Sequence, residues 1–190
     1  MRSRLKILAD QPRLALGALL TVLLAAGAVV GSGADFTASS ANPTNTFASG
    51  TLSIANSKEG TAVLTASNLR PAGPEAVGTV DIENDGSLDG TFSLSRTAPV
   101  DSDPANPLSE KLNLVVVDCG EFAGATAPDC GDGDDTTVYD GTLDAMGASA
   151  LGSYGGGEKH RYEFTVGLDG SADDAHQGAT SEVQFDFDAV

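Results

Sequence analysis

Two histidines are the side chains in this sequence best suited to acid–base chemistry or metal binding. His160 and Glu163 form an H-x-x-E pattern, whereas a zinc peptidase uses H-E-x-x-H, which places both imidazoles on one face of a helix. His160 also begins an alternating stretch typical of a strand, where it and Glu163 point to opposite faces. We therefore expect His160 and His176 to be exposed side chains without a catalytic role.

Motifs for nucleophilic catalysis and phosphate binding are missing from the sequence. Residues 147–150 (GASA) lack the second glycine of a G-x-S-x-G elbow, on which a serine hydrolase of that type depends. Residues 155–157 (GGG) are not followed by the lysine–serine pair of a phosphate-binding loop. The sequence therefore predicts a protein that is not an enzyme and requires no cofactor.

An acidic loop is the best candidate for a metal site. Ca²⁺ takes about six to eight oxygen ligands, and closely spaced aspartates on a loop supply several of them. The spacing does not match an EF-hand, because the loop lacks the closing glutamate. Two interpretations stay open, a Ca²⁺ site and a solvated acidic loop without a ligand. The residues concerned are Asp129, Asp132, Asp134 and Asp135.

The only cysteines, Cys119 and Cys130, lie close together in the sequence. An even number of cysteines in an exported chain favours a disulfide. Closing a loop of this length stabilises a fold by roughly 2–3 kcal/mol in the chain-entropy model. Zinc ligation is the alternative, but it needs about four nitrogen or sulfur ligands, and no C-x-x-C pair or spaced histidine is present. We predict a structural disulfide.

Apolar residues recur at every second position through most of the chain, as in half-buried strands. The clearest stretches are residues 162–168 and 183–189, and turn-forming Gly, Asp and Asn residues separate them. About eight such strands predict an all-β fold, a jelly-roll-like antiparallel β-sandwich. Residues 112–117 are apolar on both faces, so we place them centrally in a sheet that is covered on both sides. Residues 142–153 predict one short helical insertion.

The amino-terminal residues 1–34 have the features of a secretion signal, with a basic start, an apolar run and small residues at its exit. Ser32 and Ala34 stand before a cut that would make Asp35 the new amino terminus. An uncleaved anchor is the alternative, because the apolar run approaches the roughly 17–25 residues that span a bilayer. We expect a cleaved signal helix.

The secreted domain would then comprise residues 35–190, and its composition predicts a thin core. Leu, Ile, Val and Phe make up only about a fifth of it, which is near the limit for ordered domains. A covalent link or a partner chain compensates for such a core. Loss of the signal changes the net charge from −17 to −20. This charge disfavours nucleic acid and anionic membranes, so membrane contact is expected only through an uncleaved signal.

Several motifs together carry a resemblance to a known family. They are, in chain order, residues 46–54 (TFASGTLSI), 68–71 (NLRP), 82–88 (IENDGSL), 176–178 (HQG) and 183–189 (VQFDFDA). This series resembles the TasA/camelysin (CalY) family of secreted biofilm-matrix proteins, and the signal is similar to those cut by the signal peptidase SipW. The family's K-P-G-D turn is altered here, and the segment with the two cysteines matches nothing in the family pattern.

The resemblance implies a jelly-roll subunit of extracellular matrix or biofilm fibres. It also implies that the segment freed by signal cleavage, residues 35–45, acts as a donor strand for a neighbouring subunit, either a second copy or a related fibre protein. The donor residues would be Phe36, Thr37, Ala38 and Ser39, with Phe36 as the one large anchor. The metallopeptidase activity ascribed to some relatives is not expected, because the zinc motif is missing.

Two other functions are compatible with the sequence. One is a monomeric accessory module of the cell surface that binds a cation or a fibre partner. The other is a zinc endopeptidase, which would depend on His160 and which we regard as the weakest of the three hypotheses.

Overall fold

The computed structural model describes residues 16–21, 48–133 and 135–190. The chain divides into two units, Met1–Phe47 and Ala48–Val190. In the first unit, residues 16–21 are helical. Within the described ranges, no helix is long and apolar enough to cross a membrane. The predicted signal helix otherwise lies outside the described residues.

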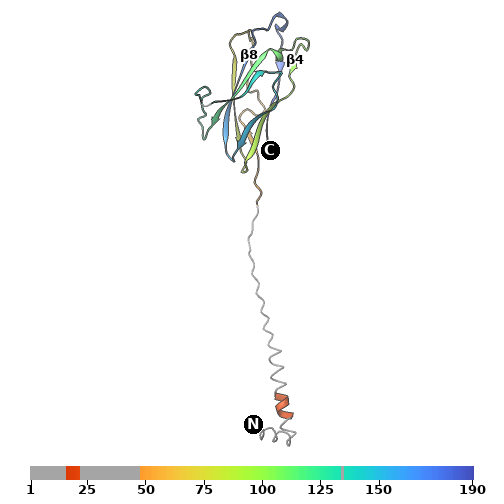
Figure 1. The fold of residues 1–190 in the computed structure, drawn as a ribbon, viewed down its shortest axis with the longest axis vertical. Coiled ribbons are helices and arrows are strands. Elements are labelled where there is room, and N and C mark those ends of the chain that lie inside the picture. The colour runs from red at the N-terminus through yellow and green to blue at the C-terminus, as the bar shows by residue number, and fades with distance from the viewer. Residues whose placement is uncertain (1–15, 22–47, 134) are drawn as a thin grey trace. The chain divides into compact units, whose positions relative to one another are not determined.

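The regular secondary structure of the second unit is almost entirely β-strand (Figure 1). Short 3₁₀ helices, η1 (Leu108–Glu110) and η2 (Asp174–His176), are the helical elements described there. The strands are β1 (Ile54–Asn56), β2 (Ala76–Asn84), β3 (Gly90–Arg96), β4 (Val100–Asp101), β5 (Leu112–Glu121), β6 (Thr136–Thr142), β7 (Ser149–Tyr154), β8 (Lys159–Leu168), β9 (Ser181–Glu182) and β10 (Phe185–Ala189).

These strands form two main sheets and a small one. The larger sheet has the order β1-β2-β8-β5-β6, the second has the order β10-β3-β7, and β4 pairs with β9. Every pairing is antiparallel. The prediction of an all-β, antiparallel fold is therefore confirmed.

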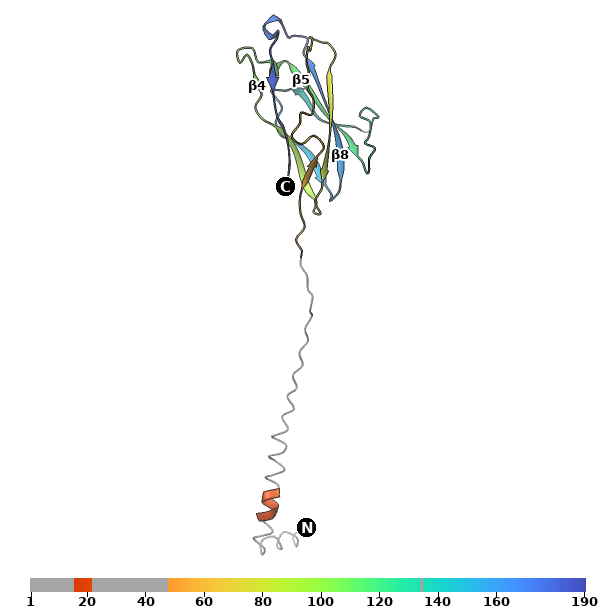
Figure 2. The same ribbon diagram turned by 180° about the vertical axis from the view of Figure 1, so that it is seen from behind.

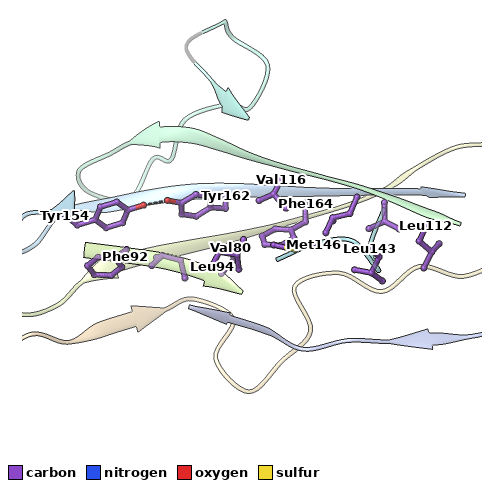
Figure 3. Packing of buried hydrophobic residues seen from close by; sticks show 13 residues of the cluster. Val80, Phe92, Leu94, Leu112, Val116, Leu143, Met146, Tyr154, Tyr162 and Phe164 are labelled. Carbon is purple, nitrogen blue, oxygen red and sulfur yellow. Dashed lines mark hydrogen bonds between the residues drawn. The ribbon is translucent and has the colours of Figure 1, made fainter. Parts of the chain in front are cut away.

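Both main sheets contribute to one hydrophobic core (Figure 3). The alternation seen in the sequence gives each strand one buried face. In β8, for example, Tyr162 and Phe164 are completely buried and Val166 is 6% exposed. Phe92 and Leu94 of β3 approach them from the second sheet, and both are also completely buried. The hydroxyls of Tyr154 and Tyr162 share a hydrogen bond inside the core.

A buried asparagine fixes the turn that leads from β2 to β3. The Asn84 side-chain amide donates to the carbonyl oxygens of Leu88 at 2.8 Å and Tyr154 at 3.1 Å. Its side-chain oxygen accepts from the backbone N–H of Gly86 at 3.0 Å. Position 86 requires glycine, because the Cβ of any other residue would lie 2.3 Å from the carbonyl oxygen of Thr51. These bonds connect the two sheets at one end of the domain.

Two expectations about local structure need correction. The helix predicted for residues 142–153 is wrong, because this stretch contains a turn followed by β7. Its β-pairing with β3 outweighs the helix preference of its alanines. Residues 112–117 do lie inside a sheet, in β5 between β8 and β6. Only one face is fully covered, since Leu112, Leu114 and Val116 are buried while Val115 and Val117 are half-buried.

The strand domain has two ends. At the end that we call proximal, the first described segment of this domain, in orange, lies near the marked C-terminus, as Figures 1 and 2 both show. Hydrogen bonds join Thr51 to Ser87, and Val190 to Thr91, at this end. At the opposite end, which we call distal, lies β4 (Figures 1 and 2).

Candidate strand-accepting groove

β10 has one edge that pairs with β3 and a second edge that pairs with no described strand. Just beyond β10, Val190 and Thr91 exchange two backbone hydrogen bonds, of 2.8 and 3.1 Å. Hydrogen-bonded and non-bonded positions alternate along an antiparallel pair. The backbone N–H and C=O groups of Phe185, Phe187 and Ala189 therefore point toward the second edge.

The aromatic side chains of β10 point inward but are only half-buried. Phe185 packs against Phe164 with ring centroids 4.8 Å apart, and Phe187 packs against Tyr162 at 6.0 Å. Phe164 and Tyr162 have no exposed surface at all. Large aromatic side chains that stay half-exposed on the inner face of a sheet indicate that the core lacks cover beside them.

A groove of about 910 Å³ runs along the open edge of β10. Residues 183–188 form one wall, and residues 58–63 form the other. The second wall comes close to β2 at Gly78, where an added Cβ would lie 2.3 Å from the carbonyl oxygen of Val63. Because only glycine permits this approach, Gly78 fixes the position of the wall and with it the groove.

Charged side chains line the groove as well. Lys58 and Glu59 come from one wall, and Asp186 and Asp188 come from β10. Charges along an open edge limit indiscriminate pairing with other strands. Three of these four side chains are acidic, so the groove favours an incoming strand without negative charge. A strand added here would gain backbone hydrogen bonds from β10 and an apolar contact with Phe185 and Phe187.

The residues predicted for signal cleavage and strand donation lie outside the described part of the chain, so their roles stay predictions. They are Ser32, Ala34 and Asp35 at the cut, and Phe36, Thr37, Ala38 and Ser39 in the donor segment.

The cysteines lie where the disulfide prediction requires. Cys119 near the end of β5 bonds to Cys130 in the following loop, with Cα atoms 4.8 Å apart. Cys119 is 3% exposed, so the bond joins the loop to the edge of the core. Phe122 in the same loop lies under Lys159 and Arg161 of β8, whose cationic groups are 5.5 and 5.8 Å from its ring. The disulfide therefore holds the β5–β6 connection against β8.

The acidic loop is described only in part. Asp134 lies outside the described residues, and Asp135 accepts a hydrogen bond from the backbone N–H of Gly131. Asp129 is exposed, and its negative charge adds a small contribution to the raised pKa of Arg161, which arises mainly from the hydrogen bond to Asp81. In the ranges that the structure describes, no group of three or more His, Cys, Asp or Glu side chains is arranged to hold a metal ion. The predicted Ca²⁺ site, with Asp132 as a further ligand, stays a prediction.

His160 is not exposed as predicted, because two strands and a turn enclose it. Its Nδ1 lies 2.9 Å from Asp118 of β5, and its Nε2 lies 3.0 Å from Glu158. The side chain is 16% exposed. Its ring stacks on Tyr154 with centroids 4.4 Å apart. No local sequence pattern indicates this cluster, because Asp118 is 42 residues away from His160 and meets it only through strand pairing.

The two carboxylates change the acid–base behaviour of His160. Burial alone would lower its pKa, but the hydrogen bonds to Asp118 and Glu158 together outweigh burial and raise the pKa. Burial, followed by the charges of Asp118 and Glu158, raises the pKa of Tyr154. An imidazolium that donates to a carboxylate on each side joins strands and neutralises charge.

His176 is also less exposed than predicted. Its side chain is 10% exposed, and Nδ1 lies 2.9 Å from Asp173. Asp173 is the N-cap residue that precedes η2, and its side chain accepts a hydrogen bond from the backbone N–H of Ala175. This arrangement is a helix cap, which satisfies backbone donors at the first turn.

No model of a known protein family matches this chain. No curated protein matches it either. The resemblance to the TasA/camelysin family therefore rests on the sequence motifs alone, and the function that it implies is a proposal.

Proposed function

We propose that this protein is a secreted subunit of extracellular matrix or biofilm fibres, with a jelly-roll fold, that assembles by donation of a strand. Residues 1–34 act as a signal that a SipW-type signal peptidase removes. The released segment 35–45 of one copy enters the groove beside β10 of a second copy or of a related subunit. The single observation that carries this proposal is the open edge of β10 beside a groove of about 910 Å³.

The donor segment suits the groove in length. Strand residues advance by about 3.3 Å, so the four residues Phe36–Ser39 extend over roughly 13 Å. The five residues of β10 extend over roughly 17 Å at the same rise. In an extended donor, Phe36 and Ala38 share one face, and Thr37 and Ser39 share the other. Phe36 would cover the half-exposed aromatic side chains of β10.

The donor segment suits the groove in charge as well. Residues 36–45 (FTASSANPTN) contain no charged side chain, and the negative charge of Asp35 would lie next to the positive α-amino group that cleavage creates. Three of the four charged side chains that line the groove are acidic. Pro43 cannot donate a backbone hydrogen bond, which ends regular pairing after about seven residues from Phe36. This polar, uncharged segment avoids the repulsion that any acidic stretch of the chain would meet.

The proposal is tested by producing the full-length chain in a secreting host and examining the secreted protein by electron microscopy. In Phe36→Asp, a buried anchor is replaced by a charge that the acidic groove repels, so we expect no fibres. Thr44→Asp adds the same charge to the same segment beyond Pro43, and we expect it to assemble like the unmodified protein. Circular dichroism should show the same β-fold in both variants.

Two results would contradict the proposal. One is fibre formation by Phe36→Asp at the same protein concentration as the unmodified chain. The other is a protein that stays monomeric at every salt concentration, with residues 36–39 hydrogen-bonded in the groove of their own subunit.

A further inference from the structure

A second pocket, of about 690 Å³, opens at the distal end of the strand domain. Its floor is apolar and includes the buried side chains of Leu112, Leu143 and Val166. Leu112 and Leu143 lie at the end of the core that is farthest from Phe92 (Figure 3). The pocket, which we call the distal pocket, therefore offers an apolar contact at the end of the core.

Two loops contribute to the wall of the distal pocket, residues 66–71 and residues 176–181. Ala72, which follows the first loop, has a φ of 51°, a backbone conformation that is uncommon for a residue with a Cβ atom. Its backbone N–H donates to the carbonyl oxygen of Leu168 at 3.0 Å. Because this bond joins the loop to the last residue of β8, the first loop is held in place by the strand.

The rim of the distal pocket carries charges of both signs. Arg70 lines the pocket from the first loop, and Asp173 and Asp174 line it from the segment of η2. All three residues are exposed. Since positive and negative charges lie on the same rim, the pocket favours neither an acidic nor a basic partner. It suits an uncharged segment with one large apolar side chain for the floor.

The distal pocket is continuous with the groove beside β10, because Val183 and Phe185 line both of them. The groove follows β10 from Phe185 to Ala189, and the next residue, Val190, bonds to Thr91 at the proximal end. A strand that lies in the groove and continues past Phe185 therefore reaches the distal pocket.

The direction of the donor strand decides which of its residues meets the distal pocket. The donor segment is joined to its own subunit at Ala48, and residues 48–50 are exposed, belong to no strand and lie at the proximal end (Figures 1 and 2). A donor parallel to β10 would bring two proximal ends together, and this arrangement closes as a reciprocal dimer. An antiparallel donor brings the proximal end of one subunit to the distal end of the next, which repeats as a fibre.

The register of an antiparallel donor brings the end of the segment to the distal pocket. With Phe36 opposite Phe187, counting residue by residue places Pro43 opposite Thr180, which lines the pocket. Residues 43–47 (PTNTF) carry no charge. In extended form they span roughly 16 Å.

We infer that the distal pocket of one subunit receives Phe47 of the donor chain, with its ring on the apolar floor. Phe47 is the only large apolar residue of the segment 35–47 besides Phe36. Two phenylalanines would then anchor the donor, one at each end of the groove. The inference deepens the proposed function and rests on it, because it assumes that segment 35–45 is the donor strand.

Fibre formation by the full-length secreted chain gives the first test. Phe47→Asp should raise the protein concentration needed for fibres about tenfold, because a charge then meets the apolar floor. Thr44→Asp adds the same charge beside a rim with both signs, so it should assemble normally. On the acceptor side, Ala179→Trp fills the pocket and should weaken assembly equally. Ala175→Trp, in the neighbouring η2 but outside the lining, is its matched control.

Peptide binding separates this contact from strand donation. The acceptor is the full-length secreted Phe36→Asp protein, and the probe is an amidated peptide of residues 35–50, titrated by calorimetry. The peptide should bind about tenfold more tightly than the same peptide with Phe47→Ala. Adding Ala179→Trp to the acceptor should remove this difference, and adding Ala175→Trp should preserve it.

Three results would overturn the inference, and they differ in what they leave standing. Equal binding of the two peptides would exclude the distal contact and leave strand donation intact. Failure of both peptides to bind would contradict strand donation and the distal contact together. A lower melting temperature of the Phe36→Asp protein after addition of Phe47→Asp would mean that Phe47 packs inside its own subunit.

Discussion

The β8–β5 pair and β10 lie on opposite sides of the same core, and they are completed to different degrees. β8 has a strand on each side, its inner aromatic residues are fully buried, and ion pairs join Lys159 to Glu83 at 2.8 Å and Arg161 to Asp81 at 2.7 Å on its outer face. β10 has a described strand on one side only, and its aromatic residues stay half-exposed. The first region is closed, and the second leaves apolar surface in contact with water.

The aromatic residues of β8 and those of β10 also differ in how much of their apolar surface contacts water. Tyr162 and Phe164 of β8 are covered by the opposite sheet of the same subunit. Phe185 and Phe187 of β10 lie beside a groove, so part of their apolar surface still contacts water. Burying that surface is favourable by about 25 cal/mol per Å². A second chain can gain this free energy, whereas the subunit alone cannot.

The largest expected effect comes from truncating one aromatic residue in each region. Phe164→Ala should lower the free energy of unfolding of the isolated subunit by about 4 kcal/mol, because it opens a cavity in a closed core. Phe187→Ala should cost about 2 kcal/mol, since part of its side chain is already in contact with water. Urea unfolding of the monomeric Phe36→Asp protein measures both. Equal costs would mean that β10 is as well covered as β8.

The disulfide provides the next test of the comparison. Replacing Cys119 and Cys130 together with serine should lower the free energy of unfolding by about 3 kcal/mol, because the unfolded chain regains the entropy of an open loop. The bond lies beside β8 and away from β10, so fibre formation at a temperature well below the melting point should persist. A loss of fibres in a folded double-serine variant would show that the two regions are coupled.

The smallest expected effect is a pH dependence that arises in the β8–β5 region. The pKa of His160 is raised above its unfolded value, so its contribution to stability is complete below about pH 6.5 and is lost as the pH rises through the folded pKa. Above that pKa, the neutral ring can donate to only one of Asp118 and Glu158. The melting temperature should therefore fall as the pH rises from 6.5 toward 9.

Two variants check the source of this pH dependence. His160→Gln should flatten the profile over the same pH range, whereas His176→Gln should leave it in place. An unchanged profile in His160→Gln would assign the dependence to another group.

The sequence predicted the longer core strands β2, β3, β5, β8 and β10, because each of them has one apolar face with period two. Val80 with Ile82, Phe92 with Leu94, and the alternating residues of β8 all point into the core as expected. Local pattern was misleading for residues 142–153, where small residues resemble a helix but pair with β3. The disulfide was predictable because two cysteines in a chain expected to be exported can pair in only one way, and the further ligands that zinc would need are missing from the sequence.

The candidate sites were harder to predict because they depend on contacts between distant segments. The groove arises from the approach of residues 58–63 to the far side of β10, and nothing in the pattern of residues 183–189 indicates which edge is open. The partners of His160 come together through the register of β5 and β8.

Amide hydrogen exchange in β10 tests the central claim most directly. In the monomeric Phe36→Asp protein, the amides of Asp186 and Asp188 should be protected by β3, while those of Phe185, Phe187 and Ala189 should exchange rapidly. In fibres of the unmodified protein, all five should be protected, because the donor strand bonds the second edge. Rapid exchange of Phe185 and Phe187 in fibres, or their full protection in the monomer, would contradict the account.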